Sequence, residues 1–252
     1  MKRIDWTIWI GIAIGFAAIL SGAWLDDLNL AFLWHPTALL IVAGGTLGAV
    51  IVRRGTSGVR DAVRAVWRLQ QRGKADVEEN RKLELAKLAW LSRSAQKNGI
   101  KAYESFADTC GDPLIAQGLL MVADRSDRHH IEQYLVRRLD LENDDGLQEA
   151  ATLEAAGGFA PTFGIIGAVL GLIGVLRVID RPEALGVGIA TAFVATLYGI
   201  GLANLIFFPL AARLRANHQA RMRFREEISA VILALAASET PRSIVNRFNL
   251  NQ

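Results

Sequence analysis

The sequence predicts an all-α protein that crosses a membrane four times and carries a helical domain between its second and third crossings. Hydrophobic residues make up 52% of the 252 positions and are concentrated in four apolar stretches. Each stretch is about as long as the roughly 20 helical residues that span a bilayer. The long segment between the second and third stretches holds most of the charged residues and shows no alternating strand pattern.

The first two spans are expected at about residues 4–24 and 33–52. The first follows a basic start, as a signal peptide does. Its apolar part is long and no small-residue cleavage site is clear, so we interpret it as a retained helix. The second contains Gly44, Gly45 and Gly48. No Gly-Lys-Ser/Thr follows them as in a phosphate loop, so these glycines indicate close helix packing.

Basic residues beside the spans predict the topology. Positive charge marks the cytoplasmic end of a span. We therefore expect both termini in the cytoplasm and two short outer loops. The residues that support this placement precede the first span and follow the second and fourth: Lys2, Arg3, Arg53, Arg54, Arg60, Arg64, Arg68, Arg72, Arg213, Arg215, Arg221, Arg223 and Arg225.

An amphipathic helix is expected directly after the second span, with Ser57 as its N-cap and its end near Gln71. Arginines at four-residue spacing oppose apolar residues there, so the helix is expected to lie at the inner membrane surface, in contact with lipid. Its expected apolar face comprises Val59, Val63, Val66 and Trp67.

The rest of the long loop reads as further helices. One is expected to end at Gly99 and the next to start at Asp112–Pro113, while the helix at 136–153 could continue into the third span. The single Cys110 excludes an internal disulfide and a cysteine-built metal site. No nucleophile–base set or metal motif is present, so we expect neither an enzyme nor a cofactor or metal. The basic residues lie beside spans, which indicates membrane topology rather than nucleic-acid binding.

The third and fourth spans form a hairpin at 155–214 around which the chain is organised. Small residues recur every three or four positions in both, which places them on one helix face. Such faces bring helix backbones into close contact. In the third span they are Gly164, Gly167, Gly171 and Gly174, and in the fourth Ala192, Thr196, Gly199 and Ala203.

Two interpretations of this hairpin are open, a packing scaffold and the lining of an ion path. Three polar residues, Thr162, Thr196 and Asn204, favour the path, because polar groups in a span face protein or water. None of them changes charge, so an ionisable group would have to come from a second protein. Pro161 and Pro209 bracket the hairpin and indicate either helix-end punctuation or a hinge.

The predicted organisation has four parts. They are spans one and two at 1–52, a cytoplasmic helical domain at 53–154, the ion-path hairpin at 155–214 and a cytoplasmic tail at 215–252.

Motifs in three spans resemble those of the MotA/PomA flagellar stator family, within the wider MotA/TolQ/ExbB proton-channel superfamily. The likeness covers essentially the whole chain. The motifs are the run 44–49 (GGTLGA), the run 160–172 (APTFGIIGAVLGL), the run 195–199 (ATLYG) followed by Ala203–Asn204, and Phe208–Pro209.

The resemblance implies a multi-pass protein of the bacterial inner membrane that converts ion flow into torque. A ring of about five copies would surround a MotB-type partner. That partner carries the essential membrane carboxylate and a peptidoglycan-binding domain. The carboxylate of the partner is in keeping with the absence of an acidic or basic residue from the apolar runs of the hairpin. The cytoplasmic loop of the ring would push on the rotor protein FliG.

The resemblance also implies roles for single residues. Pro161 and Pro209 match prolines implicated in coupling, and Thr196 matches a hydroxyl at the ion path. Sodium-driven relatives have a second threonine where this chain has Ala168. A hard cation needs several oxygen ligands. With one hydroxyl fewer, the transported ion is therefore expected to be the proton.

The rotor contact is matched less completely. Glu104 corresponds to the acidic residue of the family, while the arginine of the family falls on Gln96. Lys97 or Arg93 is expected to supply the positive charge instead. Two other functions remain open: an ExbB/TolQ-type energiser of outer-membrane processes, against which a fourth span counts, and a non-conducting scaffold.

Overall fold

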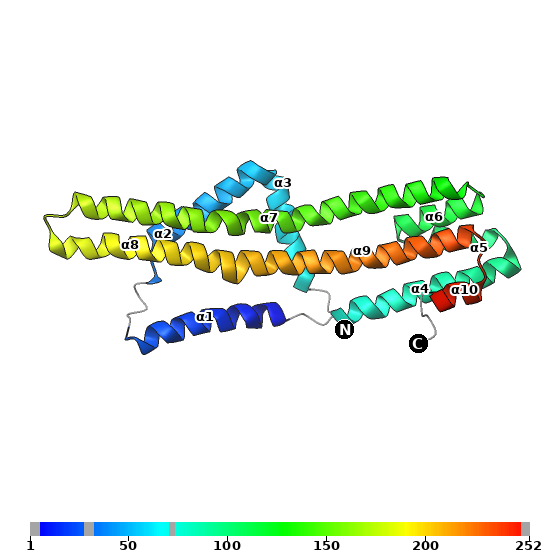
Figure 1. The fold of residues 1–252 in the computed structure, drawn as a ribbon, viewed down its shortest axis with the longest axis horizontal. Helices are drawn as coiled ribbons and strands as arrows, with labels where there is room; N and C mark the ends of the chain where they lie inside the picture. Colours follow the sequence, from blue (N-terminus) through cyan, green and yellow to red (C-terminus); the bar gives the residue numbers. More distant parts are fainter. Residues whose placement is uncertain (1–5, 28–32, 71–73, 248–252) are drawn as a thin grey trace. The chain divides into compact units, whose positions relative to one another are not determined.

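The computed structural model describes residues 6–27, 33–70 and 74–247, which are helical almost throughout (Figure 1). No residue in these ranges belongs to a β-strand, which confirms the all-α class. The predicted start of the first span at residue 4 lies outside the described residues. The helices are α1 (Thr7–Leu25), α2 (Pro36–Leu39), α3 (Gly45–Gln70), α4 (Lys74–Asn98), α5 (Lys101–Thr109), α6 (Pro113–Ala123), α7 (Arg128–Arg177), α8 (Pro182–Gly201), α9 (Phe208–Ala236) and α10 (Pro241–Arg247).

Four helical segments among the described residues are long and apolar enough to cross a membrane, as the sequence predicted. Helix α7 runs for 50 residues without interruption, so the helix expected at 136–153 does continue into the third span. The segments are Thr7–Leu25, Pro36–Leu69, Arg128–Arg177 and Leu185–Ala236.

The chain divides into two compact units. The span unit comprises Ile4–Gln71 and Leu147–Arg215, and the loop unit comprises Met1–Arg3, Arg72–Gly146 and Ala216–Gln252. The predicted domain boundaries after residues 52 and 154 both fall inside the span unit. Hydropathy marks where a chain stops being apolar, whereas compactness follows packing, and polar residues beyond the apolar stretches pack with the spans. The cytoplasmic placement of the loop remains a prediction.

Within the long helical segments that the structure describes, the span unit departs from regular α-helix at three places. Leu40–Gly44 and Leu202–Phe207 are π-helical, and each continues into an α-helix. Gly55 has φ 70° and ψ 170°, so α3 consists of two helical stretches that meet at an angle (Figure 1). A positive φ is strained for residues with a Cβ, and glycine therefore permits this bend at low cost.

The loop unit has its own apolar core, contributed by α4, α5, α6, α10 and the parts of α7 and α9 that belong to this unit. Two predicted helix boundaries are confirmed. Gly99 has φ 67° and follows the last residue of α4. Asp112 is the N-cap of α6, where its carboxylate accepts a hydrogen bond from the Leu114 amide at 3.0 Å.

One buried arginine joins three helices of the loop unit. The Arg225 side chain from α9 donates to both Glu142 carboxylate oxygens on α7, at 2.9 and 2.8 Å, and to Asp112 at the start of α6. Burial lowers the pKa of Arg225, but hydrogen bonds and charges from Glu142 and Asp112 outweigh burial and raise the pKa above its ordinary value. Arg225 was expected to be one of the charges that mark topology. That expectation remains a prediction, and the structure adds that Arg225 pairs with Glu142 and Asp112.

Candidate functional site

The glycines of α7 meet α8 at backbone contact. A Cβ built on Gly171 would lie 2.8 Å from the Gly188 carbonyl oxygen, and one on Gly164 would lie 3.0 Å from the Ala195 carbonyl oxygen. The first distance is shorter than real Cβ atoms show and the second is tighter than most, so the two helices touch through their main chains. The close approach predicted from the spacing of small residues is therefore present within one chain.

We call this close contact between α7 and α8 the seam, and it does not extend to every glycine of the spaced series. A Cβ on Gly167 would lie 2.7 Å from the Cβ of Ala195, whereas no atom lies within 4 Å of one on Gly174. From the other side, a Cβ on Gly199 would lie 2.6 Å from the Ala160 carbonyl oxygen. The regular spacing in sequence thus includes one glycine, Gly174, that does not take part.

The glycines of the second span do not behave alike. Gly45 faces the ring of Phe163 on α7, where an added Cβ would lie 2.2 Å from the ring carbon Cδ1. No described atom lies within 4 Å of an added Cβ at Gly44 or Gly48, and both glycines are exposed. Only Gly45 therefore packs closely against the hairpin in this chain. A packing role for Gly44 and Gly48 remains a prediction about a neighbouring molecule.

Both prolines of the hairpin lie inside continuous helix. Pro161 is an internal residue of α7, and its Cα would be 3.1 Å from a Cβ on Gly199, so Pro161 belongs to the seam. Pro209 lies in α9 just after the π-helical turn at 202–207. The wider π turn helps helix to accommodate a proline ring, which would otherwise clash with the carbonyl four residues earlier. Neither proline ends a helix, and whether either acts as a hinge remains a prediction.

The three polar residues assigned to the path each bond to their own helix. The Thr162 hydroxyl donates to Phe159 at 2.6 Å, the Thr196 hydroxyl to Ala192 at 3.2 Å and the Asn204 amide to Ile200 at 3.0 Å, in each case to the carbonyl oxygen. A hydroxyl that has donated its hydrogen still carries acceptor lone pairs. Thr162 and Thr196 can therefore offer an oxygen to a donor or cation. Ala168, half-buried on α7, adds none.

A histidine that sequence reasoning missed joins the second span to the fourth. His35, immediately before α2, has its Nε2 3.0 Å from the Thr191 hydroxyl oxygen on α8. Its backbone amide donates to the Tyr198 hydroxyl at 3.2 Å, and that hydroxyl donates to the Leu33 carbonyl. These contacts connect the beginning of one span to the side of another.

Two contacts meet at the Thr191 hydroxyl. It lies 2.8 Å from the Val187 carbonyl oxygen, to which it can donate, and 3.0 Å from His35 Nε2, where the donor depends on the tautomer of the ring. Nδ1 is buried and has no partner among the described residues. A histidine directly before a proline at a span start was the available signal.

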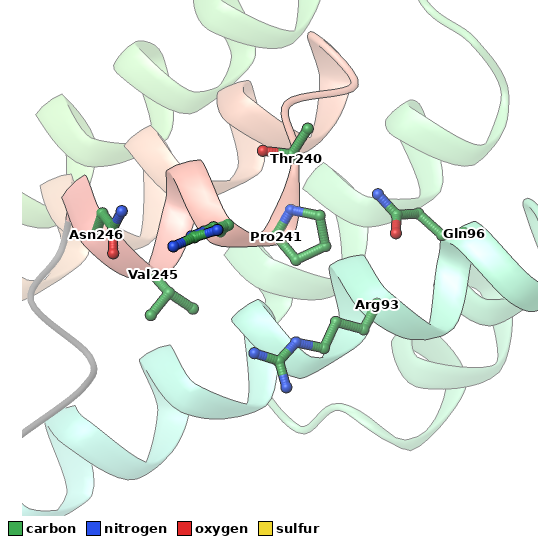
Figure 2. A pocket seen from close by; sticks show the side chains of 7 residues that line it. Arg93, Gln96, Thr240, Pro241, Val245 and Asn246 are labelled. Carbon is green, nitrogen blue, oxygen red and sulfur yellow. The ribbon is translucent and has the colours of Figure 1, made fainter.

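The expected rotor-contact residues are exposed on two helices of the loop unit. Arg93 and Lys97 lie on α4, and Glu104 lies in the first turn of α5. Arg93 and Gln96 also line a groove between α4 and α10, in which the Arg93 side chain extends towards α10 (Figure 2). None of the described lining residues is a carboxylate and two are arginines, which give this lining a positive charge. Its lining residues are Arg93, Gln96, Thr240, Pro241, Arg242, Val245 and Asn246.

Known protein families and relatives match this chain along most of its length. The family model of the Motility protein A N-terminal region matches residues 9–99, and that of the MotA/TolQ/ExbB proton channel family matches residues 106–227. Motility protein A of Bacillus subtilis (strain 168) is 29% identical, over 96% of this chain and 88% of its own length. The chain belongs to the MotA family. Chemotaxis protein PomA of Vibrio alginolyticus is 27% identical, over 96% of this chain and 92% of its own.

Solved structures agree with this membership. The flagellar MotAB stator complex from Bacillus subtilis contains a chain that matches with a TM-score of 0.83 and 28% identity, over 96% of this chain and 94% of that one. A chain of C. jejuni MotAB has the same fold, with a TM-score of 0.87 at 24% identity over 98% and 96% of the two chains.

Membership in the MotA family makes this chain a subunit of a flagellar stator, in a family of proton channels. The match over 9–99 is to a motility model, which favours the stator over an ExbB/TolQ-type energiser. The hairpin, with its hydroxyl oxygens and glycine seam, lies within the channel-family match at 106–227. No group of three potential metal-ligating side chains occurs among the residues that the structure describes.

Proposed function

We propose that this MotA-family chain conducts protons together with a MotB-type partner that binds peptidoglycan and supplies the titrating carboxylate. In this proposal about five copies form a closed ring around the partner. Proton passage along the hairpin drives the ring, and the loop unit transmits the motion to the rotor protein FliG. The chain acts as a channel and motor subunit without a cofactor of its own.

The observation that carries this proposal is the composition of the hairpin. The stretches 155–176 and 184–212 contain no Asp, Glu, Lys, Arg or His. They do contain Thr162 and Thr196, whose hydroxyl hydrogens are used inside their own helices. Acceptor oxygens can orient water and a hydrated proton but cannot store the charge. An acidic side chain from a partner completes the relay.

Ala168 supports protons over sodium as the transported ion. Its methyl group leaves this position of α7 without a ligand oxygen. A sodium ion needs several oxygen ligands to replace its hydration shell, whereas a proton passes between single oxygens and a carboxylate. We therefore expect Ala168→Thr to be compatible with folding and to be the substitution most favourable to sodium use.

Charge on the loop unit supports contact with a charged rotor surface. Arg93, Lys97 and Glu104 are exposed. Opposite charges steer and orient two protein surfaces more than they add to affinity. In this proposal the arginine and lysine of α4 face acidic residues of the rotor, and Glu104 faces a basic one.

Placement follows from the basic residues. We propose that the chain lies in the bacterial inner membrane with both termini in the cytoplasm, because arginines flank the inner ends of the spans. The loop unit then extends into the cytoplasm, where a rotor could be reached.

Vesicles test the channel directly. The chain is reconstituted alone and with a MotB-type partner in vesicles that contain a pH-sensitive dye, and a proton gradient is applied. We expect rapid proton uptake only when both proteins are present, and none when the partner lacks its membrane carboxylate. Equal uptake with the chain alone contradicts the shared site. No uptake in either sample favours a non-conducting scaffold.

A further inference from the structure

The bend at Gly55 turns the chain away from the second span within three residues of its last apolar position. Val52 is exposed, Arg53 and Arg54 follow, and helix resumes after Gly55. If this end of the span is at the cytoplasmic side, as proposed above, the second stretch of α3 lies at the level of the lipid headgroups.

One face of this stretch is packed against the span unit. Ala65 and Leu69 are buried together with Ala150 of α7 and Leu214 of α9, and Val66 packs at the edge of the same cluster. On α3, Leu69 is four positions from Ala65 and three from Val66, so these residues share one side of the helix. That side is unavailable to lipid or to another protein.

The opposite face is exposed and mixes aromatic, aliphatic and cationic side chains. Trp67 is 66% exposed and Val63 is 52% exposed. Arg60 and Arg64 have side chains that are each 62% exposed. Arg60 lies three positions before Val63, and Arg64 lies three positions before Trp67. The single apolar face predicted from sequence is therefore wrong, because Val66 is drawn into the packed side while Val63 and Trp67 lie among arginines.

The charge of this face is only partly balanced within the chain. Asp61 lies 3.5 Å from Arg64 and 4.0 Å from Arg60, in an exposed geometry that contributes little to stability. Arg68 is held at 2.6 Å by Glu149 of α7. Arg60 and Arg64 share one carboxylate and so leave a net positive charge beside Trp67.

We propose that Arg60, Val63, Arg64 and Trp67 form a binding face for anionic phospholipid headgroups at the inner leaflet. Guanidinium groups form paired hydrogen bonds with phosphate, and basic side chains beside a span are attracted to anionic lipid. An indole ring favours the interface between headgroups and acyl chains. Val63, four positions before Trp67 on the same face of the helix, contacts acyl carbon in this arrangement. This inference deepens the lipid contact and rests on the membrane placement proposed above.

Lipid selectivity tests the proposal. The full chain is reconstituted into phosphatidylcholine bilayers that contain a trace of spin-labelled phosphatidylglycerol or spin-labelled phosphatidylcholine. The fraction of motionally restricted label gives the relative association of the two lipids. We expect phosphatidylglycerol to be preferred at low salt. The preference should fall as salt rises, since the contact is electrostatic.

Matched variants locate the selective site. The double variant Arg60→Gln/Arg64→Gln should lose preference for phosphatidylglycerol by about fivefold per arginine. Its control, Arg128→Gln/Arg242→Gln, removes two exposed arginines of the loop unit and should leave the preference unchanged. Trp67→Phe keeps the charge of the binding face and an aromatic side chain at this position. It should fold normally and retain most of the preference for phosphatidylglycerol.

The outcomes separate this inference from the function it rests on. Equal restriction of both lipids by the wild type, or an equal loss in both double variants, overturns the binding face while proton uptake with the partner stays intact. Unchanged lipid selectivity with altered oligomer size in Arg60→Gln/Arg64→Gln also overturns it, and assigns the face to a second copy. A chain that restricts neither lipid has not entered the bilayer, which overturns the membrane placement as well.

Discussion

Some polar residues of the span unit could be selected as candidates from the sequence, and others could not. Thr162, Thr196 and Asn204 could be selected because each interrupts an apolar run. His35 could not, since it lies before the apolar run and its partners Thr191 and Tyr198 are 156 and 163 positions away. Both partners are ordinary residues of a span until the fold brings them to the histidine. Periodicity within one helix carries no information on such pairs.

At the residue scale, two threonine substitutions are expected to affect different properties, one the stability and the other the proton uptake. Thr191→Val removes the hydrogen-bond partner of Nε2 on the half-buried His35, and an unsatisfied buried polar group costs about 1–3 kcal/mol. Thr196→Val removes only a bond to its own helix, so stability should change little while proton uptake falls. Thermal unfolding in detergent and dye uptake in vesicles measure the two properties. Equal destabilisation by both variants would contradict the His35 contact.

Among the helices, the α7–α8 pair shows what spacing can and cannot predict. The recurrence of glycine predicted a packing face, and Gly164, Gly167 and Gly171 do lie against α8. Gly174 has the same spacing and meets nothing within 4 Å. Spacing gives the side of a helix, but the point at which two helices diverge depends on their crossing. The bends and π turns of the spans likewise follow from packing between elements.

A pair of glycine substitutions tests the seam. Gly199→Ala places a Cβ 2.6 Å from the Ala160 carbonyl oxygen, so the helices must separate, at about 1–3 kcal/mol. Gly174→Ala adds a methyl group in open space and should be neutral or slightly stabilising, because alanine favours helix over glycine. Melting temperatures of the purified variants provide the comparison. A Gly199→Ala protein as stable as wild type would show that α7 and α8 are packed less closely than in this structure.

At the scale of the whole molecule, the loop unit contains a charge network that could not be predicted from the sequence. Arg225 is only 6% exposed and contacts α6 and α7 through Asp112 and Glu142. In sequence it is one of several arginines after the fourth span. Its neighbour Arg223 is exposed. Which arginine is structural is decided by the meeting of three helices, two of which come from distant parts of the chain.

Removal of this buried cation should destabilise the loop unit. Arg225→Met leaves Glu142 and Asp112 without their partner, and we expect a loss of about 3 kcal/mol, the lower end for a broken buried pair, because Asp112 is partly exposed. Arg223→Met changes the same charge on an exposed surface and should change stability by less than about 0.5 kcal/mol. Chemical unfolding followed by circular dichroism measures both. Similar curves would contradict a structural role for Arg225.

Contact with the rotor is tested in cells. Glu104→Lys reverses an exposed charge on α5 and should reduce swimming speed while membrane insertion and partner binding stay normal. Glu132→Lys makes the same change at an exposed position of α7 and serves as the control. Swimming speed on soft agar and co-purification with the MotB-type partner are the measurements. Unchanged swimming in Glu104→Lys removes this residue from the proposed rotor contact.

The sequence by itself determined the class, the four spans, the helix ends at Gly99 and Asp112 and the family, because these depend on local composition, capping and motif. The tertiary structure decided which glycines touch, that His35 bonds to the fourth span, that Arg225 is buried, and that Trp67 lies exposed among arginines. Each of these depends on residues that are far apart along the chain. Such contacts arise from the packing of several helices, and no pattern within one segment encodes them.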